Sequence, residues 1–202
     1  MASSALSLDF DLAVGGNRGL RSYAAGASRR HEVFGRLKLG YGARATLVTG
    51  GVELAPVKHD GPDRVTIDGA RLAMINADIH ASAKIAPRLE GGFNLDVAGF
   101  SFGAHENASF RRSSSDPART VGASPGGGNL FLFGSNDRGS LNSEFYLAWQ
   151  FSPSWSVRGG LAHLLTEYVI ADDLGGATRR YRKFSNLAFA AVRWTPKNRE
   201  KR

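Results

Sequence analysis

Residues 72–85 alternate, position by position, between two chemically different faces of an extended strand. The apolar face carries Ile75, Ala77, Ile79, Ala81, Ala83 and Ile85, and the opposite, mostly polar face carries Met74, Asn76, Asp78, His80, Ser82 and Lys84. A soluble sheet would turn the apolar face to a core and the polar face to water. A transmembrane β-barrel makes the opposite arrangement, with the apolar face in lipid and the polar face in a lumen.

The same alternation recurs along the chain and predicts further strands of similar length. These runs lie at residues 6–15, 33–48, 89–97, 141–151, 155–166 and 184–194. Each is about ten residues or longer, the length that a tilted strand needs to cross a bilayer. The facing of the last run is ambiguous, because Leu187 and Phe189 share parity with Arg193.

Seven runs are one short of an even number, and single-chain bacterial barrels have even strand counts. We therefore expect about eight strands, with the missing one near residues 16–30 or around 129–133. The alternative is that residues 6–14 do not belong to the wall of the barrel.

Composition fits one all-β domain. The chain has 202 residues, 25 of them glycine, and no cysteine, and its mean hydropathy is −0.23. The missing cysteine excludes disulfide scaffolds, thiol catalysis and cysteine-bound zinc. Residues 1–7 lack the segments of a signal peptide, so we expect a mature chain whose signal peptide has been removed. We expect a single barrel domain over residues 1–196, followed by a basic tail over 197–202.

The predicted connections alternate between short and long. Ala86-Pro87-Arg88 and Ser152-Pro153-Ser154 are tight turns in which proline fixes φ and ends the strand. Long polar or glycine-rich segments lie at about residues 49–70, 104–138 and 170–180. Short periplasmic turns and long extracellular loops are typical of bacterial barrels. The composition of 104–138 buries too little apolar surface to fold by itself, so we expect that loop to be mobile, with residues 129–133 as a candidate strand extension.

Two segments carry a resemblance to a known family. GGFNLDVAGFSFG at 91–103 and GSLNSEFYLAWQFSPSWSVRGGLAHLLTEY at 139–168 resemble uncharacterised outer-membrane β-barrel proteins of Gram-negative bacteria. The resemblance covers the central strands and implies a bacterial outer-membrane location and a barrel architecture. It brings no catalytic residues with it. One departure is the C-terminus: such barrels usually finish on an aromatic residue, whereas Trp194 is followed by Thr195, Pro196 and the basic tail.

Ten ionisable side chains have lumen-facing parity. They are Arg36, Lys38, Arg44, Asp78, His80, Lys84, Glu90, Asp96, Glu144 and Arg158. The interior of a barrel of about eight strands is only wide enough for side chains to fill it. Buried charges are costly without partners. We therefore expect an ion-paired network that closes the lumen, with a narrow water or ion path as the alternative.

Aromatic side chains are expected at both rims of the barrel, because amphipathic rings favour the headgroup level. Trp149, Phe151, Trp155 and Trp194 would form the girdle at one rim, and Tyr168 and Tyr181 would belong to the girdle at the other. The alternative is that these rings form the core of a soluble sheet.

A net charge of +8 indicates a partner of negative sign, with simple solvated surface charge as the alternative. The candidate anion-binding residues are Arg111, Arg112, Arg179, Arg180, Arg182 and Lys183. On extracellular loops these residues would meet the phosphates of lipopolysaccharide, which arginine binds bidentately. Nucleic acid is disfavoured as a partner because no recognition motif accompanies the charge.

An enzyme hypothesis rests on His80 and Ser82, which share one face of a strand. The histidine could act as a base toward the serine hydroxyl, as in a membrane-lipid hydrolase. Their lumen parity argues against it, because a lipid substrate would approach from outside, and Asp78 on the same face favours a network.

The expectation as a whole is an antiparallel transmembrane β-barrel with a structural or surface-binding role. Its expected partners are membrane lipid, lipopolysaccharide and an unknown extracellular ligand, and we expect a monomer without cofactor or metal. The alternatives are the lipid hydrolase, a narrow pore and a soluble lipocalin-like binder.

Overall fold

Eight long strands form the wall of the molecule. The computed structural model describes residues 6–33, 35–57, 62–172 and 178–196. The wall strands are β1 (Leu6–Gly16), β2 (Leu20–Glu32), β3 (Leu37–Pro56), β4 (Arg64–Ala86), β5 (Leu89–Phe102), β9 (Leu141–Ser152), β10 (Trp155–Ile170) and β11 (Arg180–Trp194). Among the described residues, no helix is long and apolar enough to cross a membrane.

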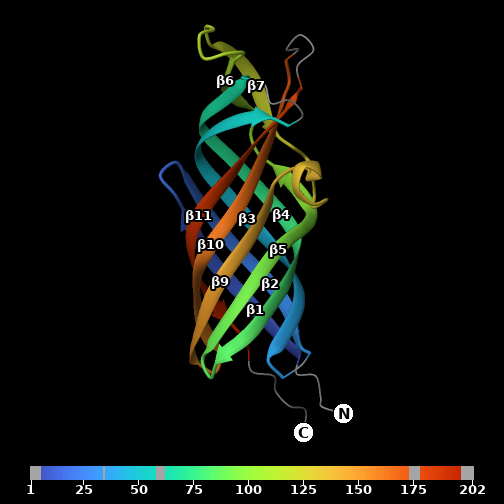
Figure 1. Cartoon of the computed structure of the whole chain (residues 1–202), viewed down its shortest axis with the longest axis vertical. Helices are drawn as coiled ribbons and strands as arrows, with labels where there is room; N and C mark the ends of the chain where they lie inside the picture. Colours follow the sequence, from blue (N-terminus) through green and yellow to red (C-terminus); the bar gives the residue numbers. More distant parts are fainter. Residues whose placement is uncertain (1–5, 34, 58–61, 173–177, 197–202) are drawn as a thin grey trace.

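The wall closes on itself. Each strand pairs antiparallel with two neighbours in the order β1, β2, β3, β4, β5, β9, β10, β11, and β11 pairs again with β1. The result is the barrel seen in Figure 1. The expected eighth strand is β2, and β1 does belong to the wall. The alternation of apolar and polar residues is weak in β2, because its outer face carries alanines such as Ala25 and Ala27.

Polar side chains face inward and apolar side chains face outward over the lower part of the barrel. On β4, Asn76, Asp78 and His80 are buried, whereas Ile75 is 52% exposed and Ile79 is 46% exposed. The exposed apolar side chains continue around the wall and include Leu12, Val14, Leu39, Tyr41, Leu47, Phe145, Leu147, Leu161 and Val192. We call this surface the apolar belt. It is the arrangement of a transmembrane barrel, and the fold class predicted from the sequence is confirmed.

A second, smaller ring of strands stands above the barrel. β3, β4, β10 and β11 run on past the other wall strands and are joined by the hairpin of β6 (Glu106–Arg111) and β7 (Arg119–Pro125). The pairings run β3–β4–β6–β7–β10–β11 and return to β3. We call this six-stranded ring the cap; its β6–β7 hairpin lies at the top of Figure 1.

The cap has an apolar core of its own. Its buried side chains include Val52, Leu54, Val65, Ile67, Phe110, Val121, Tyr168, Ile170 and Tyr181. At its base the register between β3 and β4 shifts, so that Asp68 and Gly69 lie opposite Gly51. Such a bulge exchanges the two faces of a strand. Residues 49–70 therefore read as a loop in the sequence although most of them are strand.

The segment 104–138 also folds, contrary to our expectation that it would be a mobile loop. Besides the β6–β7 hairpin it contains β8 (Gly128–Leu130) and a 3-10 turn, η1 (Gly134–Asn136). β8 pairs with Ala98–Phe100 of β5, above the part of β5 that pairs with β9. Both chain ends lie at the opposite end of the barrel, together with the short β4–β5 and β9–β10 turns (Figure 1).

Candidate functional site: the ion-paired lumen

A chain of ion pairs begins at the lower end of the lumen. Glu90 of β5 receives three cations: Arg30 at 2.7 Å, Lys38 at 2.8 Å and Arg193 at 3.2 Å. Arg193 also lies 3.2 Å from Asp11 of β1. The carboxylate of one strand thus joins cations from β2, β3 and β11.

The chain continues toward the middle of the barrel. Arg158 of β10 lies 3.2 Å from Asp11 and 3.7 Å from Glu144 of β9. Arg44 of β3 lies 2.6 Å from Glu144 and also pairs with Asp96 of β5. These side chains are almost fully buried, so the network is a low-dielectric one in which unpaired charges would be costly.

Tyr146 of β9 fills the space between two of these arginines. The guanidinium carbon of Arg158 lies 4.7 Å from the ring centroid and that of Arg193 lies 5.5 Å from it. Arg193 also donates a hydrogen bond to the Tyr146 hydroxyl at 3.3 Å. A Cβ atom on Gly92 would come within 2.4 Å of the ring, so the glycine makes room for it.

The charges of the network nearly balance. Its cations are Arg30, Lys38, Arg44, Arg158 and Arg193, and its carboxylates are Asp9, Asp11, Asp78, Glu90, Asp96 and Glu144. A cavity of about 20 Å³ remains beside Arg44 and Asp78, room for about one water molecule. Side chains therefore fill this part of the lumen almost completely.

The inward side chains change character higher in the barrel. On β4, the polar series that ends at Asn76 is followed by Met74 and Leu72, both buried. Leu164 of β10 and Leu187 of β11 lie in the same apolar cluster. This cluster is continuous with the core of the cap, so the lumen is polar in its lower half and mainly apolar in its upper half, where Thr166 and Ser185 are buried among the apolar side chains.

Of the ten predicted lumen residues, six lie in ion pairs: Lys38, Arg44, Glu90, Asp96, Glu144 and Arg158. Asp78 and His80 are buried beside this network and lie 3.3 Å from each other. Arg36 and Lys84 differ from these eight, because they line the open lower end of the lumen and make no ion pair among the described residues. Both are exposed at the lower end, because Arg36 precedes β3 and Lys84 lies near the β4–β5 turn.

Four network members were missed in the sequence: Asp9, Asp11, Arg30 and Arg193. Arg30 belongs to β2, in which the alternation of apolar and polar residues is weak. Arg193 shares parity with Leu187 and Phe189, which proved to be inward apolar residues of the upper lumen. The parity of Asp9 and Asp11 could have identified them.

One rim of the barrel carries the aromatic residues predicted for it. Trp149, Phe151, Trp155 and Trp194 are all exposed on the outer face. Trp194 stacks on Phe10 with ring centroids 5.5 Å apart and lies 6.3 Å from Trp155.

The prediction for the other rim was wrong. Tyr168 is 1% exposed and Tyr181 is 0% exposed, because both face inward in the core of the cap. Each ring therefore packs inside the protein and cannot reach lipid headgroups.

His80 and Ser82 are not hydrogen-bonded to each other. The Nδ1 atom of His80 lies 2.7 Å from Asn94 Oδ1, and its Nε2 atom lies 3.3 Å from Asp78 Oδ2. The Ser82 hydroxyl is buried and has no hydrogen-bond partner among the described residues. Neither side chain faces the apolar belt, where a lipid would arrive.

The six candidate anion-binding residues come from two hairpins at the outer end. Arg111 and Arg112 lie where β6 ends, and both are exposed. Arg179 donates to the carbonyl oxygens of residues 170 and 171, and Arg180 makes a bidentate pair with Glu167 at 2.7 and 3.0 Å. Arg182 lies 5.4 Å from the ring of Phe184, and Lys183 is half-buried.

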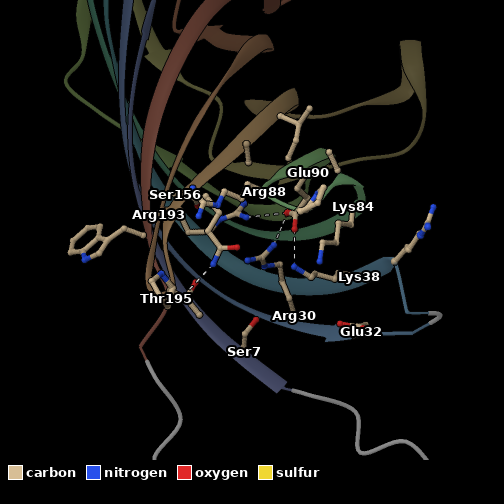
Figure 2. A pocket seen from close by; sticks show the side chains of 18 of the residues that line it. Ser7, Arg30, Glu32, Lys38, Lys84, Arg88, Glu90, Ser156, Arg193 and Thr195 are labelled. Atoms are coloured by element: carbon tan, nitrogen blue, oxygen red, sulfur yellow. Dashed lines mark hydrogen bonds and ion pairs between the residues drawn. The ribbon is translucent and has the colours of Figure 1, made fainter.

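The lower end of the lumen opens into a cavity of about 400 Å³. Figure 2 shows Lys84, Arg88, Lys38 and Glu90 around it. We call this cavity the mouth. Within the described part of the chain, no group of His, Asp or Glu side chains is arranged to hold a metal ion.

Comparison with known proteins adds little to this picture. No family model and no curated protein matches the chain. Similar solved structures include Neisserial surface protein A, with 9% identity, 94% of each chain covered and a TM-score of 0.39. The outer membrane protein Ail of Yersinia pestis has 8% identity over 95% of this chain and 100% of that one, with a TM-score of 0.41. A major outer membrane protein from Thermus thermophilus has 12% identity over 93% and 99%, with a TM-score of 0.42.

Identities and TM-scores this low carry no argument about function. The description of this chain as a transmembrane barrel rests on its own closed strand pairing, its apolar belt and its charged interior.

Proposed function

We propose that this chain is a small bacterial outer-membrane barrel with a closed lumen and a structural or surface-binding role, and that it is not an enzyme. The observation that carries the proposal is the filling of the interior along its length. Ion pairs occupy the lower half, mainly apolar side chains occupy the upper half, and this apolar core continues into the cap.

The upper lumen supports closure most strongly. Leu20, Val48, Leu72, Leu164 and Leu187 are each at most 2% exposed. An ion that crossed this layer would lose its hydration without gaining polar partners, which is very costly. The charged layer below opposes passage in another way, because each cation there already holds a carboxylate.

Refolding into lipid vesicles tests the proposal. A compact species whose gel mobility changes on heating, without discrete conductance steps in a planar bilayer, is the expected result. Stepwise openings from the wild-type protein would overturn the closed lumen. Absence of any folded, lipid-inserted species would overturn the membrane assignment itself.

The surface-binding role is supported by the basic residues of the outer end. Arg111 and Arg112 lie beyond the apolar belt, on the β6–β7 hairpin of the cap. In an outer membrane this hairpin would stand at the level of lipopolysaccharide phosphates, and guanidinium groups bind phosphate bidentately.

A lipopolysaccharide-binding assay separates this role from a purely structural one. The double variant Arg111→Gln/Arg112→Gln should bind lipopolysaccharide vesicles several-fold more weakly and with a smaller salt dependence. Arg18→Gln/Arg138→Gln removes the same charge from exposed positions outside the six candidate residues and should bind as the wild type does. Equal binding by all three proteins would leave only the structural role.

A further inference from the structure

We propose that the mouth of the barrel is a binding site for a phosphate-bearing anion. The mouth lies at the end that the chain termini and the short turns share (Figures 1 and 2). Its charged lining consists of Arg30, Arg36, Lys38, Lys84, Arg88 and Arg193 against Glu32 and Glu90. The lining thus holds six cations and two carboxylates. The balance between cations and carboxylates differs between the deep side of the mouth, toward the lumen, and its outer side, toward solvent.

The deep side of the mouth is already neutralised. Glu90 binds Arg30, Lys38 and Arg193 at once. Arg30 and Arg193 each hold a further carboxylate, Asp9 and Asp11 respectively. These groups belong to the lumen network and have little charge left for a ligand.

The outer side of the mouth is not neutralised. Arg36, Lys84 and Arg88 have no side-chain partner among the described residues, and Glu32 is the carboxylate that lines this side with them. Arg88 is part of the β4–β5 turn, and Arg36 lies in the β2–β3 connection. Two cations from neighbouring connections and one from the end of β4 therefore line one concave space.

The backbone holds these cations in place. The Lys84 amide donates a hydrogen bond to the Arg36 carbonyl at 2.9 Å, which ties the β2–β3 connection to β4. The Gln150 amide donates to the Arg88 carbonyl at 2.9 Å, which ties the β4–β5 turn to β9. The backbone at all three positions is thus fixed before any ligand arrives, so that binding has to order only the side chains.

Phosphate is the ligand chemistry that suits this arrangement. A guanidinium offers paired donors that match two phosphate oxygens, and an ammonium adds a mobile point charge. Like charges around a concave surface focus a positive potential that attracts an anion. The cavity of about 400 Å³ is within the usual size range for small-molecule sites. The phosphate could come from the headgroup of a phospholipid beside the rim or from a soluble phosphate ester.

Calorimetric titration of the barrel refolded in neutral detergent, with inorganic pyrophosphate as the probe, tests the site. Wild-type protein should bind, and added salt should weaken binding. Lys84→Gln/Arg88→Gln should bind roughly tenfold more weakly, since it removes two of the three unpaired cations. Glu32→Gln should bind a few-fold more tightly, because it removes the opposing carboxylate.

The matched control is Arg18→Gln/Arg138→Gln, which removes two exposed cations from the β1–β2 connection and from the segment before β9, neither of which lines the mouth or belongs to the candidate anion-binding residues. It should bind pyrophosphate as the wild type does. No saturable binding by the wild type, or an equal loss in both double variants, would overturn the site. Folding of each variant is checked by its heat-modifiable mobility.

A second arm identifies the source of the phosphate. The same titration is made in nanodiscs of phosphatidylcholine, with and without phosphatidylglycerol. Loss of pyrophosphate binding when the anionic lipid is present assigns the site to a headgroup, and unchanged binding assigns it to a soluble ester. A failed site would leave the closed-lumen proposal intact, because conductance measures the upper lumen and not the mouth.

Discussion

Glu144→Gln tests whether the buried ion pairs hold the barrel together. Glu144 is 2% exposed and lies 2.6 Å from Arg44 and 3.7 Å from Arg158. It also accepts hydrogen bonds from Asn94 at 2.9 Å and Asn142 at 3.2 Å. Glutamine keeps the volume, removes the charge and places an amide donor among groups that already donate.

The expected loss can be worked from these contacts. Removing one partner of a buried ion pair costs about 3–5 kcal/mol, because the remaining charge is left buried. Arg44 retains Asp96 and Arg158 retains Asp11, so neither guanidinium loses every carboxylate. We therefore expect the lower end of the range, about 3 kcal/mol, or roughly two factors of ten in the folding equilibrium constant.

Urea titration in lipid vesicles, followed by tryptophan fluorescence, measures this loss. The matched control is Glu53→Gln in the cap, whose carboxylate lies 3.6 Å from Arg64 with side chains 62% and 45% exposed. That exposed pair should contribute at most about 1 kcal/mol. If Glu144→Gln cost no more than Glu53→Gln, the lumen network would not stabilise the fold and our reasoning about it would be refuted.

Three further predictions concern packing inside the protein and the depth of the aromatic rim in the bilayer. Ile67→Ala in the cap, where the side chain is 1% exposed, should cost about 2–4 kcal/mol in urea titration, whereas Ile75→Ala on the belt should cost much less; equal losses would contradict a dry cap. Gly92→Val should prevent formation of the heat-modifiable species, because its side chain would collide with Tyr146; a folded valine variant would show that the ring can move. The fluorescence of the rim tryptophans Trp149, Trp155 and Trp194 should be quenched more by lipids brominated near the headgroup than by lipids brominated near the chain end, and the reverse order would place the rim elsewhere.

Much of the barrel was readable from local pattern. The period of two in residues 72–85 assigned one face to lipid and the other to the lumen, and the structure keeps that assignment from Met74 to Ser82. Proline in the β4–β5 and β9–β10 connections located two short turns. The strand β2 gave a weaker signal, because alanine on its lipid face differs little in hydropathy from the glycine and serine of its inner face.

The partners within the lumen were less accessible to sequence reasoning. Asp11 and Arg193 are separated by almost the whole chain, and they meet because β1 pairs with β11 to close the wall. Parity places a charged side chain inside a barrel without saying which opposite charge it will meet, since that depends on register between distant strands.

The alternation of residue types alone determined which side chains face lipid, because the two faces of a strand are set by backbone geometry one residue at a time. The tertiary structure alone decided the cap. A bulge at Asp68 and Gly69 exchanges the faces of β4, and the β6–β7 hairpin then completes a ring around Tyr168 and Tyr181. A shift of one residue reverses inside and outside, and only pairing with a neighbouring strand reveals that such a shift has occurred.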